Sequence, residues 1–525
     1  MIKNNLIKIV KNLAATEIHD RANLTNLKRK LSNQLMMAPP LNSDLLGTYH
    51  QLRQKKSVKE NLILERLLRK REIRTLSGVA VITVLTKPYS CPGKCIYCPT
   101  EEGMPKSYLS NEPAAARAAG TKFNPYQQVK VRLEALKING HNTDKVELIV
   151  LGGSWSVYQK SYQAWFIKRC FEALNGKNYK TLDQAQKINE RAEHRCIGLT
   201  LETRPDLINE AELHRMRQLG CTRVELGVQS IYDPILKLNK RGHTVKQTIE
   251  ATAMLKQAGF KITYHMMPNL PGATVAKDLA MFEKLFSSAD FQPDQLKIYP
   301  CLVTKNSELY NWYRKGKYKP YSNKQLLNLL IKVKKIIPPY VRIVRLIRDI
   351  PAQSIVAGNK VTNLRQLITN QYPGICRCIR CREAGHQKIS KTNNQNIKIK
   401  LNIKKYNASR GQEYFISIDS EDKKILYAFL RLRVDDDLEN NFFNELNGAA
   451  IIRELHTYGE ITPIGKIGNQ VQHFGLGKKL IAEAEKICRL KKIKKIAVIS
   501  GIGVKDYYRK LGYKQIGTYL AKNLS

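Results

Sequence analysis

Short apolar segments alternate with longer segments of helical periodicity between about residues 78 and 350. The apolar segments are rich in β-branched residues, which is typical of buried strands. They cover residues 79–85, 146–153, 196–202, 223–228, 261–267 and 295–300. Strands separated by helical segments are typical of βα units around a parallel sheet. The pattern predicts an α/β fold with a partial or full (β/α) barrel.

The regions that flank this predicted barrel have other patterns. Residues 1–75 are helix-rich and basic, and residues 351–396 hold three closely spaced cysteines before a polar stretch. Residues 397–525 are strand-rich, with one helix after a Gly-x-Gly turn and another near the end. A chain of 525 residues and 60.0 kDa is too long for one core. We expect a basic helical region (1–75), the barrel (76–350), a metal-binding linker (351–396) and a second α/β domain (397–525).

The predicted strands end in glycine, proline or polar residues, and in a barrel such ends converge on one mouth. Gly152 and Gly153 lack a Cβ and would let a ligand approach the backbone closely, although a plain turn is an alternative. Glu202 and Arg204 are two residues apart on an extended segment and would point the same way. Such a pair suits a ribose or a carboxylate, and a surface ion pair is an equal alternative.

Three cysteines with the spacing C-x3-C-x2-C, Cys91, Cys95 and Cys98, follow the first predicted strand in a loop rich in proline. Thiolates suit iron–sulfur clusters or zinc, and three without an obvious fourth leave one coordination position open. A zinc site with a distant histidine is the alternative. The arrangement resembles the radical S-adenosylmethionine (SAM) superfamily. That resemblance implies a [4Fe–4S] cluster, SAM on the fourth iron, and the glycine pair at the SAM amino group.

A second cysteine cluster, Cys376, Cys378 and Cys381, has the spacing C-x-C-x2-C. Three thiols this close are unusual unless they bind a metal, and zinc is the expected one. His386 and His456 are candidates for the fourth ligand.

The C-terminal region contains a Q-x-x-G-x-G turn, with Gln472, Gly475 and Gly477, that opens a predicted helix over residues 478–490. The backbone N–H groups of such a turn bind a diphosphate. Flanking strands and the later pattern Y-x-R-x-L-G-Y (507–513) resemble the acetyl-CoA site of GNAT acyltransferases. The resemblance assigns Tyr507 or Tyr508 to the CoA sulfur, whereas a role in the core is the alternative.

The charge is strongly unbalanced, with 89 Lys+Arg against 44 Asp+Glu and a formal net charge of +45. Such a balance indicates a polyanionic partner, nucleic acid before membrane. Genome composition explains an excess of lysine but not the shortage of acids. Eleven cysteines in tight clusters favour a reducing compartment. Without a signal-like segment or an apolar run of ~20 residues, we expect a soluble cytoplasmic protein.

A radical SAM barrel followed by a GNAT domain resembles the Elongator catalytic subunit family of tRNA uridine acetyltransferases, over about residues 76–524. The motifs that carry this resemblance are LETRPD (201–206), CTRVELGVQS (221–230), RGHTVKQ (241–247), HMMPNLPG (265–272), RELHTYG (453–459) and VISGIGVKDYYRKLGY (498–513). The short gap between the first two cysteines and the complete second trio resemble bacterial or archaeal members that act without a larger complex. A homodimer is compatible with this resemblance.

The resemblance implies tRNA as partner, acetyl-CoA as co-substrate and an external electron donor. Its acetyl-CoA contacts would be Lys145, Glu454, Leu455, His456, Thr457, Leu476, Gly477, Lys478 and Tyr508. A radical from SAM would take hydrogen from the acetyl methyl group, and the resulting carbon radical would add to carbon 5 of the wobble uridine. Thioester hydrolysis would then leave a carboxymethyl group. The alternatives are a protein lysine acetyltransferase and a module that binds tRNA and acetyl-CoA without turnover.

Overall fold

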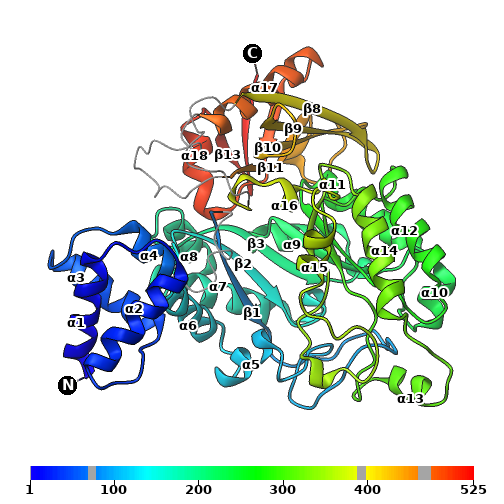
Figure 1. The fold of residues 1–525 in the computed structure, drawn as a ribbon. Helices are drawn as coiled ribbons and strands as arrows, with labels where there is room; N and C mark the ends of the chain where they lie inside the picture. Colours follow the sequence, from blue (N-terminus) through cyan, green and yellow to red (C-terminus); the bar gives the residue numbers. More distant parts are fainter. Residues whose placement is uncertain (1, 69–77, 387–397, 459–474, 525) are drawn as a thin grey trace.

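A seven-stranded parallel sheet lies at the centre of the protein (Figure 1). The computed structural model describes residues 2–68, 78–386, 398–458 and 475–524. The strands follow one another in sequence order, so that β1 and β7 are the two edges of an open, partial barrel. They are β1 (Ala80–Leu85), β2 (Lys145–Leu151), β3 (Arg195–Thr203), β4 (Arg223–Gln229), β5 (Lys261–Met266), β6 (Gln295–Ile298) and β7 (Arg342–Arg345).

The six predicted strands are confirmed, whereas β7 was not predicted. Its four residues are an isoleucine and a valine between two arginines, and so short a segment carries little periodicity. The helices of this part include α5 (Pro113–Gly120), α6 (Pro125–Ile138), α7 (Lys160–Asn175), α8 (Leu182–Asn189), α9 (Glu210–Gln218), α10 (Asp233–Leu238), α11 (Val245–Gln257), α12 (Val275–Ser287), α13 (Glu308–Arg314), α14 (Asn323–Ile336), α15 (Leu364–Gln371) and α16 (Ile379–Arg382).

Four N-terminal helices form a separate layer beside α6, α7 and α8 (Figure 1). They bury their own apolar cluster, which includes Ile9, Leu45 and Leu64. The helices are α1 (Ile2–Ala15), α2 (Arg21–Gln34), α3 (Asn42–Gln54) and α4 (Leu62–Leu68). Within the four described ranges, every helix is too short or too polar to cross a membrane.

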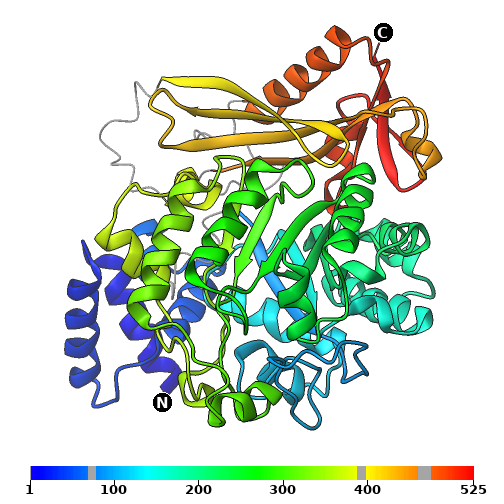
Figure 2. The same cartoon turned by 90° about the vertical axis from the view of Figure 1, so that its right-hand side faces the viewer.

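A second sheet of seven strands, mixed rather than parallel, lies across one end of the central sheet (Figure 2). Its order is β13-β14-β12-β11-β10-β9-β8, and only β11 and β12 pair in parallel. The strands are β8 (Ile399–Asn407), β9 (Gly411–Ser420), β10 (Leu426–Asp435), β11 (Ala449–Thr457), β12 (Lys495–Val498), β13 (Lys514–Ile516) and β14 (Tyr519–Asn523). Helix α17 (Leu476–Leu490) packs on this sheet, and α18 (Lys505–Arg509) follows β12.

The second sheet packs against the N-terminal ends of the central strands. A Cβ on Gly501 would lie 2.0 Å from the carbonyl oxygen of Ile197 near the start of β3, so only glycine fits there. The apolar core is continuous across this contact. The two sheets therefore form one packed unit, with the second at the end opposite the cysteine loop.

Buried ion pairs join the two sheets. Asp294, just before β6, binds Arg453 of β11 at 2.5 Å and lies 3.6 Å from Arg431 of β10. Burial alone would raise the pKa of Asp294, but Arg453 and Lys256 hold it well below its usual range. Buried charges are tolerated only when they are paired this closely. The interface is therefore specific as well as extensive.

Candidate active site

The Cys91–Cys98 loop begins at the C-terminal end of β1 and is held by backbone hydrogen bonds from several parts of the barrel. Thr86 N donates to Leu151 O at 3.0 Å, and Ile96 N donates to Asn239 O at 3.3 Å. The hydroxyl of Tyr158 donates to Lys87 O at 2.7 Å. These anchors on both sides hold the loop over the mouth of the barrel.

Cys91, Cys95 and Cys98 line one pocket over this mouth. Among the described residues, only the Cys376, Cys378 and Cys381 trio brings three ligand atoms within 4.8 Å of one another, so the first trio is spaced more widely. A single tetrahedral zinc needs thiolate sulfurs about 3.8 Å apart, as its Zn–S bonds of ~2.3 Å dictate. A cluster in which each cysteine binds a different iron accepts wider spacing. The geometry favours the iron–sulfur interpretation of this loop.

The glycine pair after β2 lies next to the cysteine loop. Gly152 and Gly153 have φ of 131° and 96°, where other residues are strained. A Cβ on Gly152 would lie 1.9 Å from Thr86 Oγ1. The following residue, Ser154, places its hydroxyl 4.0 Å from Cys91 Sγ. Gly152 is therefore required by close packing, and the role of the pair in binding SAM stays a prediction.

Glu202 and Arg204 do not act as one pair. Glu202 accepts a hydrogen bond from the Tyr108 hydroxyl at 3.0 Å and lines the barrel cavity. The buried Arg204 binds Asp206 through two nitrogens, at 2.9 and 3.0 Å. Since Arg204 is buried and paired with Asp206, the alternative of a surface ion pair with Glu202 is wrong. Binding of a ribose or a carboxylate by the two residues stays a prediction.

A cavity of about 610 Å³ runs the length of the barrel strands. At the cysteine-loop end it is lined by Tyr97 and Tyr299, and at the other end by Arg223 and Arg342, at the starts of β4 and β7. Arg342 also donates to the Tyr458 hydroxyl at 3.0 Å, one residue beyond β11. The cavity therefore runs from the part of the cysteine loop at Tyr97 and Pro99 to Arg342, which contacts the second sheet.

A buried charged cluster at this cavity was missed by the sequence patterns: His265 and Lys297 line the cavity, and both donate to Glu225. Glu225 accepts from His265 Nε2 at 2.8 Å and from Lys297. Burial would raise the pKa of Glu225, but Lys297 and His265 lower it well below its usual range. Glu225, His265 and Lys297 each lie within a strand whose pattern is otherwise apolar. A charged residue at an inward position of a buried strand was the available signal.

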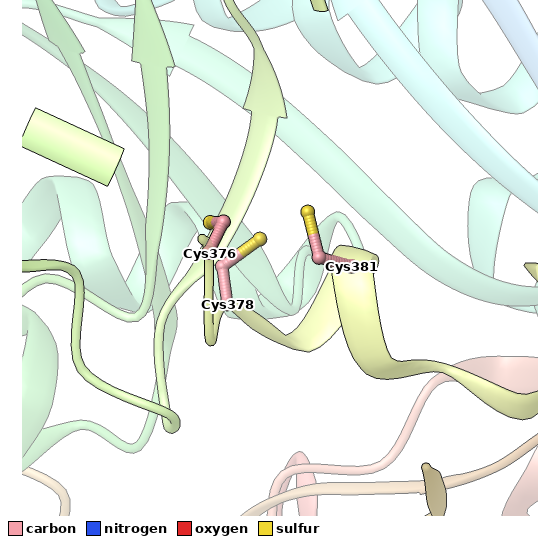
Figure 3. Close-up of side chains that lie close together, drawn as sticks. All are labelled: Cys376, Cys378 and Cys381. Atoms are coloured by element: carbon pink, nitrogen blue, oxygen red, sulfur yellow. The ribbon is translucent and has the colours of Figure 1, made fainter. Parts of the chain in front are cut away.

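The second cysteine trio is compact. Cys376 and Cys378 lie on the turn that leads into α16, and Cys381 lies in that helix (Figure 3). Their spacing fits one zinc ion. His456 is outside this group and packs at a tilt against Tyr458, with ring centroids 4.3 Å apart, and the side chain of His386 is outside the described residues. The fourth ligand is therefore not His456 in this arrangement.

Most of the predicted acetyl-CoA residues lie in the second sheet and on its helices. Gly475 is the N-cap of α17, with φ of 67°, and a Cβ on Gly477 would lie 2.6 Å from the Tyr507 hydroxyl. Burial raises the pKa of Tyr507, which therefore keeps its proton. Tyr508 is buried in the core. Tyr507 is thus the tyrosine that reaches the turn.

The remaining members of this predicted set differ in their surroundings. Glu454 binds Arg431 at 2.9 Å and lies 3.5 Å from Lys261, so it belongs to the interface between the sheets. Leu455, His456 and Thr457 form the end of β11, and Lys145 is the first residue of β2. Leu476 is buried and Lys478 exposed at the start of α17, and Gln472 lies outside the described residues. Their contacts with acetyl-CoA stay predictions.

The open parallel sheet and its cysteine loop define a radical SAM protein. Residues 86–285 match the Radical SAM superfamily model, and residues 293–372 match the Radical SAM C-terminal domain. Membership of that superfamily implies a [4Fe–4S] cluster and SAM. The three open thiols, the close glycine cradle and the buried guanidinium groups behind the loop fit these groups.

Relatives match nearly the whole chain. It is 46% identical to the tRNA uridine(34) acetyltransferase of Methanocaldococcus jannaschii over 499 residues, 92% of this chain and 90% of that one. It is 37% identical to Elongator complex protein 3 of Schizosaccharomyces pombe, over 98% of this chain and 97% of that one. A solved structure of the archaeal Methanocaldococcus infernus Elp3 with an N-terminal deletion has a TM-score of 0.74 at 43% identity, covering 85% of this chain and 100% of that one. The chain belongs to the Elongator Elp3 family.

Proposed function

We propose that this protein is a tRNA uridine acetyltransferase that attaches a carboxymethyl group to carbon 5 of the wobble uridine. Family membership over almost the full length supports the reaction class. The net charge of +45 supports a polyanionic substrate. The uridine is flipped out of the anticodon loop so that its carbon 5 reaches the barrel.

The single observation that carries this proposal is the cavity of about 610 Å³, which is lined by Tyr97 of the cysteine loop at one end and by Arg342, the partner of Tyr458, at the other. Cys91, Cys95 and Cys98 stand at one end of the barrel, and the end of β11 meets Arg342 at the other. A radical reaction on a thioester requires both reagents to share one space that excludes bulk water. A barrel with a solid core would have separated the two sites.

The chain's own residues have the following roles in this proposal. The three cysteines hold the cluster, which together with SAM supplies a 5′-deoxyadenosyl radical. Gly153 admits the SAM amino group. The α17 turn binds the CoA diphosphate through its N–H groups. Tyr507 donates its proton toward the CoA sulfur when the thioester is hydrolysed, since its phenol stays protonated.

The second trio would hold a structural zinc, because its thiols are too close together for a cluster with one iron per cysteine. An external reductant supplies the electron. We place the protein in the cytoplasm, where tRNA and a reducing environment coincide. A homodimer is compatible with this function, and no larger complex is required.

Product analysis tests the proposal. Reduced, cluster-loaded protein is incubated with SAM, acetyl-CoA and tRNA, and the digested tRNA is searched for 5-carboxymethyluridine. We expect this nucleoside together with 5′-deoxyadenosine, and neither when SAM is omitted. Formation of 5′-deoxyadenosine without the modified nucleoside would refute the proposed tRNA reaction. Acetylated lysine formed without SAM would support a protein acetyltransferase, and binding without turnover would support a binding module.

A further inference from the structure

Two buried arginines lie behind the cysteine loop, and neither has a role in the function proposed above. Arg204 follows β3, and Arg241 follows α10; their exposed fractions are 3% and 7%. A buried guanidinium group needs acceptors for its N–H groups, because an unsatisfied one is costly. The hydrogen-bond acceptors of these two side chains therefore indicate the role of the two arginines.

Arg241 connects the barrel to the loop. Its Nη2 donates to Gly227 O of β4 at 2.5 Å, and its Nη1 donates to Cys95 Sγ at 3.6 Å. Its Nε is buried and has no hydrogen-bond partner in the described parts of the chain. Arg241 also forms no ion pair with a described carboxylate. Its positive charge is therefore directed at the thiol of Cys95.

The guanidinium group of Arg204 lies against the backbone of the cysteine loop at Gly93, next to the Cys95 sulfur. The carboxylate of Asp206 accepts hydrogen bonds from the Nε and Nη2 of Arg204. The Nη1 of Arg204 is buried and has no hydrogen-bond acceptor among the described residues. A Cβ on Gly93 would lie 2.4 Å from this Nη1 and 3.5 Å from Cys95 Sγ. Gly93 is thus required between Cys91 and Cys95 so that the guanidinium group can come this close.

We propose that Arg204 and Arg241 are positioning residues that donate hydrogen bonds to the Cys95 thiolate and to the cluster it holds, and thereby make that cluster easier to reduce. The inference rests on the family-implied cluster of the proposed function. Reduction adds one negative charge, which adjacent buried cations stabilise. Hydrogen bonds to ligand sulfur act in the same direction.

The local charges make Arg241 the stronger of the two. Asp206 pairs directly with Arg204 and offsets much of its charge, whereas the same carboxylate acts on Arg241 only from beyond ion-pair distance. The neighbouring His243 adds no charge, because burial and the two arginines lower its pKa to about 2. We therefore expect the larger effect from substitution of Arg241.

The test is a redox titration of the anaerobically loaded full-length protein, followed by electron paramagnetic resonance, without tRNA or acetyl-CoA. For Arg241→Gln we expect the ratio of reduced to oxidised cluster at a fixed potential to fall about tenfold, or about 59 mV for one electron. For Arg204→Gln we expect a fall of about threefold. Arg241→Lys keeps the charge and should recover most of the difference.

Lys240→Gln is the matched control, since this exposed neighbour removes one positive charge from the surface and binds only Glu308 in the described structure, at 2.6 Å. It should leave the potential unchanged. The iron and sulfide contents of each variant show whether its cluster is loaded. If Arg241→Gln holds no cluster, the potential of Arg204→Gln tests the proposal. Potentials equal to the wild type in the loaded glutamine variants would overturn the proposal. So would a tenfold loss of SAM affinity in Arg204→Gln with an unchanged potential, which would assign Arg204 to SAM. Because no tRNA is present, failure here is distinct from failure of the proposed function.

Discussion

The two cysteine trios use the same residue type in nearly the same spacing but differ in geometry. Cys91, Cys95 and Cys98 line an open pocket, and Arg241 donates to one of their sulfurs. Cys376, Cys378 and Cys381 lie within 4.8 Å of one another on a tight turn. Two additional residues between the first two cysteines separate a site that faces a cavity from one that closes on itself. This difference in geometry predicts that substitutions in the two trios have different effects on metal content and stability.

The largest effect is expected from Cys95→Ala in the open trio. Loss of one of three ligands should abolish cluster loading, and with it all formation of 5′-deoxyadenosine and 5-carboxymethyluridine. Iron, sulfide and zinc analysis checks this on the purified protein. Zinc should remain, and its simultaneous loss would contradict the independence of the two trios.

The buried ion pairs of Asp294 join the central sheet to the second sheet. Asp294→Asn leaves Arg453 and Arg431 without their carboxylate and should cost about 3–5 kcal/mol of unfolding free energy. The depressed pKa of Asp294 means that its contribution is present above the unfolded-state value of about 3.9 and is lost as pH falls below it.

Denaturant unfolding at pH 7 and below pH 4 measures this contribution. The difference in unfolding free energy between Asp294→Asn and the wild type should be smaller in acid than at pH 7. A variant as stable as the wild type at pH 7 would show that the interface does not depend on this carboxylate.

In the compact trio, Cys378→Ser should remove zinc and lower the unfolding free energy by about 3 kcal/mol, in the upper range for single substitutions. Cluster loading should persist because the pocket of Cys91 shares no residue with this turn. Thermal unfolding together with metal analysis gives both quantities. Loss of iron with retained zinc would reverse the assignments of the two trios.

The smallest effect is expected at the tyrosine beside the α17 turn. Tyr507→Phe should slow thioester hydrolysis about tenfold, or about 1.4 kcal/mol, with little change in stability. Tyr508→Phe is the matched control, because its ring packs in the core while its neighbour reaches Gly477. Release of free CoA measures the rate, and an equal loss in both variants would argue against a specific role for Tyr507.

Periodicity and motif spacing predicted much of the fold. Six of the barrel strands were predicted because consecutive β-branched residues indicate a buried strand locally. The short β7 was missed since its arginines interrupt the apolar pattern. Glu225 and Lys297 were missed because each pairs with a residue on another strand, which a local pattern does not encode.

By itself, the sequence determined six of the barrel strands, the two cysteine trios, the glycine turns and the family, because these depend on neighbours within a few residues. The tertiary structure decided that Arg204 lies against Gly93 of the cysteine loop and that Tyr507 rather than Tyr508 reaches the turn. It also decided that a cavity joins the two ends of the barrel. Those outcomes depend on which side chains meet across long sequence separations, and only packing in three dimensions selects such contacts.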